Sequence, residues 1–170
     1  PDSAARGTVL EVKQEKGLGA TIDVIVYDGS LQKNDTVVIG GLEGPIVTKV
    51  KALLEPSPLS EMRDGKAKFS HVDNVVAATG VKIVGAGVEY AVAGMPVVST
   101  SKSLSLEAAK ELVQKEISEF SLKVDSSGIV IKADTLGSLE ALMKLLHEKG
   151  ISVKSASIGG ISRKDIADAE

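Results

Sequence analysis

Two glycine-rich segments are the first places where this sequence could bind a phosphate group. Segment 85–87 (GAG) follows an apolar run, as the dinucleotide-binding pattern G-x-G-x-x-G does, but Tyr90 stands where the third glycine should be and no clear acidic strand end follows about 20 residues on. Segment 16–20 (KGLGA) is also rich in glycine, yet the phosphate-loop pattern G-x-x-x-x-G-K-[ST] occurs nowhere in the chain. We therefore interpret both segments as connections between strands.

The residue types that carry most enzyme chemistry are sparse. The chain has no cysteine, and His71 and His147 are its only histidines. The sequence therefore shows no metal-ligand cluster and no pairing of a nucleophile with a histidine. We expect no catalytic residue, no bound metal and no cofactor in this chain.

One pair of residues keeps a second function open. Asp134 and Thr135 follow the apolar run 128–133, and ligands often bind at the carboxyl ends of strands in open α/β sheets. The alternative function is therefore a small-molecule-binding or enzymatic α/β domain with its site near Asp134–Thr135. The interpretation that we prefer is that these residues cap the helix that follows them.

The composition is that of a globular protein with an aliphatic core. Hydrophobic residues make up 43% of the chain, but it has only two tyrosines, two phenylalanines and no tryptophan. Few aromatic rings are therefore available to stack on nucleic-acid bases. The formal net charge is −3, and neither half of the chain is basic. No apolar run approaches the ~20 residues of a membrane helix. The absence of cysteine is typical of a reducing, cytoplasmic compartment.

Several lysines and arginines stand in predicted loops. Isolated charges there are usually solvated surface, but Lys and Arg on loops can also contact nucleic-acid phosphates without reading bases. Any such contact would be local, because no part of the chain is basic overall. The candidates are Lys13, Lys16, Lys33, Arg63, Lys66 and Lys68.

The first 104 residues predict a small antiparallel barrel. Within 6–40, β-branched residues alternate in the runs 8–13 and 22–27, a third apolar run covers 37–39, and Asp28-Gly29 and Asn34-Asp35 supply turns. Further strands are predicted over 46–54, over 72–84 with a break near Thr79-Gly80, and over 97–100, while the proline-containing segment 55–68 is predicted to be a surface loop. Short strands with glycine turns and no long helix between them indicate a barrel or sandwich.

The hydrophobic period changes near residue 104. A helix over 105–120 is predicted, with Ser105 as its N-cap, and it should either bridge two domains or cover the second sheet. We place the domain boundary between 1–104 and 105–170. The serines of the polar linker before and at the helix start are candidate hinge residues: Ser99, Ser101, Ser103 and Ser105.

The remaining residues predict an incomplete α/β domain. A strand over 128–133, a helix over 136–149 ended by Gly150, and a strand over 151–158 form a βαβ unit with parallel strands. Ser162 and Asp165 resemble a capping box that opens another helix. Because this pattern stops at Glu170, we expect the domain to be truncated at its C-terminal end.

Two long segments resemble a known family. RGTVLEVKQEKGLGATIDVIVYDGSLQKNDTVVIGG followed by GPIVTKVKALLEP resembles the barrel, or second domain, of translational GTPases. GIVIKADTLGSLEALMKLLHEKGISVKSASIGGISRKDI resembles the third domain, an α/β/α sandwich, of the translation initiation factor five-B family, the archaeal and eukaryotic relatives of bacterial initiation factor two. The archaeal version is the most similar, and the segments come in the family's order.

The resemblance implies a role that composition does not show. The chain would be a non-catalytic, monomeric part of a ribosome-dependent GTPase that promotes subunit joining and initiator tRNA positioning. It would relay the nucleotide state and contact small-subunit rRNA. GTP and magnesium would bind in a GTPase domain that this sequence does not contain, and the barrel would pack against that domain. Initiator tRNA would be held by a C-terminal domain that is also absent.

Overall fold

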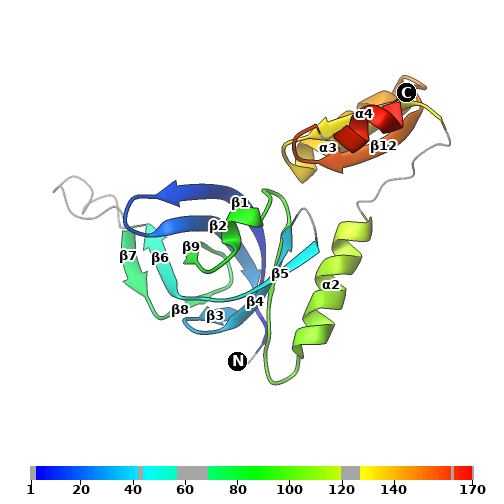
Figure 1. The fold of residues 1–170 in the computed structure, drawn as a ribbon. Helices are drawn as coiled ribbons and strands as arrows, with labels where there is room; N and C mark the ends of the chain where they lie inside the picture. The colour runs from blue at the N-terminus through cyan, green and yellow to red at the C-terminus, as the bar shows by residue number, and fades with distance from the viewer. Residues whose placement is uncertain (1–2, 42–43, 57–68, 120–126, 162, 170) are drawn as a thin grey trace.

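The computed structural model describes residues 3–41, 44–56, 69–119, 127–161 and 163–169, and it shows a β-barrel followed by a small α/β unit (Figure 1). An eight-stranded sheet with the order β5-β4-β10-β1-β2-β9-β6-β7 forms most of the barrel, and its neighbouring strands pair antiparallel. The strands β3 and β8 form a separate antiparallel pair. The predicted fold class is confirmed.

The described part of the barrel contains ten strands and one short 3₁₀ helix. Their bounds are β1 (Arg6–Glu15), β2 (Gly19–Asp28), β3 (Ser30–Gln32), β4 (Thr36–Gly41), β5 (Gly44–Lys49), β6 (Ala52–Pro56), β7 (Phe69–Val72), β8 (Asn74–Val76), β9 (Thr79–Val84) and β10 (Pro96–Ser99), with a 3₁₀ helix η1 (Val88–Tyr90) between the last two.

The turn residues adopt the backbone conformations that the sequence predicts. Gly29 has φ 73°, and a Cβ there would collide with the carbonyl of Ala4, so only glycine fits this reversal. Asn34 also has a positive φ of 73°, as asparagine tolerates better than most residues. The glycine-rich segment 85–87 leads into the three-residue η1 and is a turn between barrel strands.

Several strand boundaries differ from the prediction. The single strand expected over 46–54 is two strands, β5 and β6, because the ladder is interrupted at Val50 and Lys51: β5 pairs with β4, whereas β6 pairs with β9 and β7. The break expected near Thr79-Gly80 lies at Ala77-Ala78, where Ala78 has φ 66°, and β3 was not predicted. The predicted loop 55–68 is β6 strand at Glu55 and Pro56, and the rest of it lies outside the described residues.

The core inside the barrel is built almost entirely from aliphatic side chains. The largest fully buried apolar residues of this core are Val, Ile and Leu side chains contributed by most of the strands: Ile22, Leu31, Ile39, Leu53, Ile83, Val9, Val24, Val26, Val37 and Val50. Each fully buried side chain of this size contributes roughly 1.5–3 kcal/mol relative to its exposed state. The core therefore forms without aromatic residues.

The first long helix, α2 (Leu106–Glu119), packs on the outside of the barrel. Its Ala109 and Val113 are buried against Val38 of β4 and Val98 of β10. This corrects our expectation that the helix would cover the second sheet, because its apolar stripe docks on the barrel. Ile117, near the C-terminal end of α2, also packs against the cluster formed by Val92, Met95 and Leu136. The domain boundary after residue 104 stays a prediction.

The α/β unit has the predicted βαβ order. The strands β11 (Ile129–Ala133) and β12 (Val153–Ile158) pair in parallel, and α3 (Leu136–Glu148) connects them. At the end of α3 the N–H of Gly150 donates to the carbonyl of His147, and that of Ile151 donates to the carbonyl of Leu146. These two bonds form a Schellman motif, which confirms Gly150 as the terminating glycine. The final helix is α4 (Arg163–Ala169), and Ser162 of the expected capping box lies outside the described residues.

The barrel and the α/β unit touch at the start of α3. Leu136 is buried against Val92 and Met95 in the connection that leads into β10. Its backbone N–H donates to the carbonyl of Ala93 at 3.3 Å. A Cβ at Gly94, which has φ 92°, would lie 3.0 Å from the Leu136 Cβ, so glycine permits this close approach.

Candidate functional site

A buried lysine on β9 is the most unusual residue of the barrel. Lys82 stands between Val81 and Ile83, and only 2% of the residue is exposed. Because side chains alternate along a strand, its two neighbours enter the core while Lys82 lies on the outer face of the sheet. A buried ammonium group needs charged partners, since its desolvation is costly.

The partners of Lys82 are two carboxylates on the hairpin formed by β1 and β2. The Nζ lies 2.7 Å from Asp23 Oδ1 and 3.2 Å from Glu15 Oε1. Neither contact has hydrogen-bond geometry, so the Nζ has no hydrogen-bond partner in the described part of the chain. The attraction between the ammonium group and the two carboxylates is coulombic.

A second lysine shares one of these carboxylates. Lys13 Nζ lies 3.2 Å from Asp23 Oδ2 and 2.8 Å from Glu11 Oε2. The hydrogen bonds to Glu11 and Asp23 raise the pKa of Lys13 above its usual value. Together these residues form a charge network across β1, β2 and β9 with three carboxylates and two ammonium groups.

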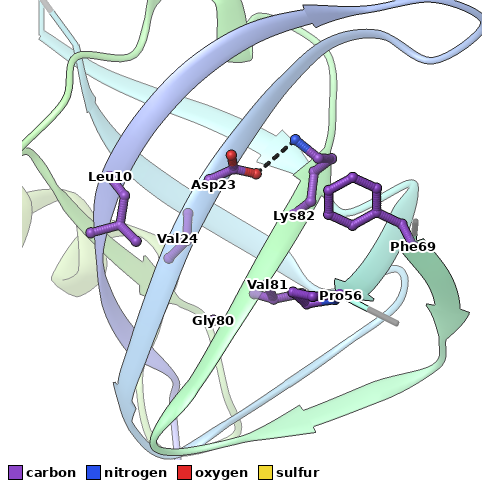
Figure 2. A pocket seen from close by; sticks show the side chains of 8 residues that line it. All are labelled: Leu10, Asp23, Val24, Pro56, Phe69, Gly80, Val81 and Lys82. Carbon is purple, nitrogen blue, oxygen red and sulfur yellow. Dashed lines mark ion pairs between the residues drawn. The ribbon is translucent and has the colours of Figure 1, made fainter. Parts of the chain in front are cut away.

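Phe69 of β7 completes the surroundings of Lys82. The Nζ lies 5.0 Å from the centroid of the ring, within the ~6 Å over which a cation is attracted to an aromatic face. Figure 2 shows the ring beside the lysine side chain, with Asp23 on the other side of the ammonium group.

A groove of about 360 Å³ runs across β2 and β9 beside this network (Figure 2). Its lining is mainly apolar and includes Leu10, which is 56% exposed, and Gly80. We call this feature the outer groove, and its lining residues are Leu10, Asp23, Val24, Pro56, Phe69, Gly80, Val81 and Lys82. Its volume and apolar walls suit the binding of an apolar group.

The described phosphate-contact candidates lie apart: Lys13 is in strand β1, Lys16 in the β1–β2 turn and Lys33 in the β3–β4 turn. Lys13 is engaged by Glu11 and Asp23, whereas Lys16 is exposed in the β1–β2 turn. Lys33 is exposed in the β3–β4 turn, where its N–H donates to the carbonyl of Asp73. Their roles stay predictions, and the other three candidates, Arg63, Lys66 and Lys68, lie outside the described residues.

The structure brings Lys33 next to two lysines that we did not select. Asn34 donates its N–H to the carbonyl of Val50, and Val50 donates to the carbonyl of Asp35. These bonds join the β3–β4 turn to the short connection between β5 and β6, which follows Lys49 and contains Lys51. Lys33, Lys49 and Lys51 are all exposed. We call these three lysines the basic turn pair, after the two neighbouring connections at which they lie. Only the tertiary contact between the two turns reveals this grouping.

The four serines of the predicted hinge have structural roles. Ser99 is 1% exposed in β10, and its Oγ accepts the N–H of Ala5 at 2.7 Å. The Oγ of Ser101 accepts the N–H groups of Ser103 and Leu104. Ser105 caps α2, since its Oγ accepts the N–H of Ala108. Rotation about this segment would break these bonds, and the hinge itself stays a prediction.

Thr135 caps α3, as the simpler interpretation of this pair predicted. Its Oγ1 accepts the N–H of Ser138 at 3.1 Å, while Asp134 is exposed. Within the described ranges no group of three or more His, Asp or Glu side chains could hold a metal ion. None of the described helices is long and apolar enough to cross a membrane.

The sequence analysis missed Lys82, Phe69 and the outer groove. One signal was available, namely a lysine in the middle of the β-branched run at 81–84. A charged residue inside such a run predicts either an outward position or a buried ion pair. The partners Asp23 and Glu15 could not be identified, because they belong to strands about 60 residues earlier in the chain.

Comparison with known proteins relates both parts of the chain to translation factors. Residues 100–170 match the family model described as translation-initiation factor 2. Over 168 residues, 99% of the chain, it is 52% identical to a probable translation initiation factor IF-2 from Pyrococcus furiosus, and 50% identical to one from Ignicoccus hospitalis. The chain spans 17% and 27% of the lengths of these relatives.

A solved structure is similar throughout the chain. The crystal structure of GDP-bound aIF5B from Aeropyrum pernix superposes with a TM-score of 0.85 at 46% sequence identity, covering 99% of this chain and 28% of that one. The sequence and structural matches cover the same nearly complete length. This chain is therefore homologous to a segment of the proteins named translation initiation factor IF-2 or aIF5B.

Proposed function

We propose that this chain is the barrel and adjoining α/β part of a five-B type initiation GTPase, and that it relays nucleotide state while contacting the small ribosomal subunit. The single observation that supports the relay is the packing of Leu136 against Val92 and Met95. Because the start of α3 is packed against the barrel, a displacement of the barrel would be transmitted to the α/β unit through close-packed side chains.

The proposed ribosomal contact is electrostatic and made through loops. The basic turn pair, Lys33, Lys49 and Lys51, has exposed side chains, and no ion pair engages them within the described part of the chain. Lysines in such positions contact phosphates and orient a protein on RNA without reading sequence. Lys16 is a further candidate, while Lys13 is less suited because two carboxylates already neutralise it.

Binding to isolated small ribosomal subunits over a series of salt concentrations tests this proposal. We expect weak, salt-dependent association of the 170-residue chain, and a lower affinity for the variant Lys33→Glu/Lys51→Glu. A plot of the logarithm of the binding constant against the logarithm of the salt concentration has a negative slope. Its magnitude should decrease by about one for each phosphate that the variant no longer binds. Lys144→Glu, an exposed lysine on α3, is the matched control and should bind as the parent does.

Two results would contradict the proposal in different ways. If the chain does not bind the subunit at low salt, the ribosomal role of this segment is wrong. If it binds and the double variant matches Lys144→Glu, the contact lies elsewhere on the chain. We also expect no measurable GTP affinity for the chain, and a saturable GTP titration would overturn its proposed non-catalytic role.

A further inference from the structure

The outer groove is built by two departures from regular sheet structure. Between Val9 and Glu11 the register of β1 against β2 shifts, so that Leu10 is an extra residue in the ladder. Such a bulge redirects a side chain, and Leu10 is 56% exposed as a result. The large apolar side chain at the edge of the groove therefore projects into solvent instead of entering the core.

The second departure is Gly80 in β9. A Cβ built there would meet no heavy atom within 4 Å, and the residue does not have a positive φ. Neither crowding nor backbone conformation therefore requires glycine at this position. Glycine within a strand weakens it and often marks a place where a ligand or another backbone approaches closely. Here the glycine keeps the space above the strand open.

Lys82 lies at the polar end of the groove. Its side chain is 1% exposed, and its Nζ has ion-pair contacts but no hydrogen-bond partner among the described residues. Its ammonium group is held by the carboxylates of Asp23 and Glu15 and is closed off from solvent. Asp23, which lines the groove and whose side chain is 26% exposed, gives this end of the groove its polar character.

The surrounding charges select the class of occupant. Among the described residues, three carboxylates, Glu11, Glu15 and Asp23, accompany the two ammonium groups of Lys13 and Lys82 in this network. This surplus repels the phosphates of a nucleic acid and favours a cation. Glu11 is accessible to such a cation, because its side chain is 57% exposed.

We propose that the outer groove binds an extended protein segment that places one large apolar side chain over Gly80. A flanking basic side chain of the segment lies near Glu11. The partner is a protein with an apolar residue next to a lysine or arginine. This site is separate from the basic turn pair and does not depend on the contact proposed there.

The probe for this site is the peptide acetyl-Lys-Leu-Lys-amide, titrated into the isotope-labelled 170-residue chain and followed through amide resonances. We expect saturable shifts at Leu10, Gly80 and Lys82 with an affinity in the millimolar range. Acetyl-Lys-Ser-Lys-amide and acetyl-Glu-Leu-Glu-amide should each bind at least fivefold more weakly. The first comparison tests the apolar side chain and the second tests the charge.

Two variants connect the binding to the groove. Gly80→Val fills the open space with a residue that strands favour and should reduce the affinity at least tenfold. Leu10→Ser removes the exposed wall, leaves the core intact and should reduce the affinity at least threefold. The control is Gly137→Ala, at a glycine of α3 that also has no heavy atom near its Cβ position. This variant should leave the peptide affinity unchanged.

Three outcomes would overturn the proposal. The first is the absence of saturable shifts at the groove with the leucine peptide. The second is equal affinity for the leucine and serine peptides, or unchanged affinity in both Gly80→Val and Leu10→Ser. The third is tighter binding of an oligouridylate at the same amides, which would assign the groove to nucleic acid instead.

Discussion

The ammonium group of Lys82 lies 2.7 Å from the carboxylate of Asp23, and the lysine side chain is 1% exposed while the aspartate side chain is 26% exposed. The two members of this pair are therefore unequally buried. Removing the aspartate would leave a buried cation with Glu15 alone, whereas removing the lysine would leave a carboxylate that reaches solvent and keeps Lys13. Removing the Asp23 carboxylate and removing the Lys82 ammonium group should therefore change the stability of the fold by different amounts.

We expect Asp23→Asn to lower the free energy of unfolding by roughly 3 kcal/mol, because it leaves the buried ammonium group of Lys82 under-compensated. Lys82→Met should lower the free energy of unfolding by less than Asp23→Asn does, because the apolar methionine needs no charged partner and its buried stem packs similarly. Urea unfolding of both variants measures the difference. A larger destabilisation by Lys82→Met than by Asp23→Asn would contradict this account of the pair.

The alkaline stability of the chain should depend on Tyr27. Tyr27 is half-exposed, and the partial burial of its phenol raises its pKa above the ordinary value of 10.0, with the nearby charge of Glu116 adding to the effect. The folded state thus holds this proton more tightly than the unfolded state. The resulting stabilisation is complete below pH 10.0 and is lost as the pH rises through the folded-state pKa.

Ultraviolet titration of tyrosinate in a Tyr90→Phe background tests the Tyr27 prediction, because Tyr27 is then the only tyrosine of the chain. We expect a midpoint above 10.0 that moves down in Glu116→Gln. Lys13 contributes with the same sign, since its raised pKa gives stability that is lost as the pH rises through that value. A Tyr27 midpoint below 10.0 would show that the phenol is not desolvated.

The contact between the barrel and the α/β unit should be measurable at one amide. The N–H of Leu136 donates to the carbonyl of Ala93, so its hydrogen exchange reports whether the two parts are docked. We expect Met95→Ala, on the barrel side, to speed exchange at Leu136 by removing the packed side chain. Leu136→Ala should in addition destabilise the chain by about 2–5 kcal/mol.

The control for this contact is Leu145→Ala on the same helix. Leu145 is 49% exposed, so its truncation should change stability by less than about 0.5 kcal/mol. Unchanged exchange at Leu136 in Met95→Ala would show that the contact does not hold the two parts together. The proposed relay would then lack its physical connection.

The sequence by itself determined the elements whose signals are local. Alternating β-branched residues predicted most of the barrel strands, Gly29 and Asn34 predicted their turns, and Ser105, Thr135 and Gly150 predicted the helix ends. Each of these signals acts over a few residues, because strand alternation, positive φ and helix capping are properties of neighbouring backbone groups.

Only the tertiary structure decided which distant residues meet. Nothing local indicates that Lys82 lies against Asp23 and Phe69, that the turns of Lys33 and Lys51 join, or that α2 packs on β4 and β10. The short unpredicted strand β3 is of the same kind, because its pairing with β8 joins segments more than 40 residues apart. Strand pairing and apolar packing bring these segments together, and their free energy depends on surfaces that exist only once the barrel has closed.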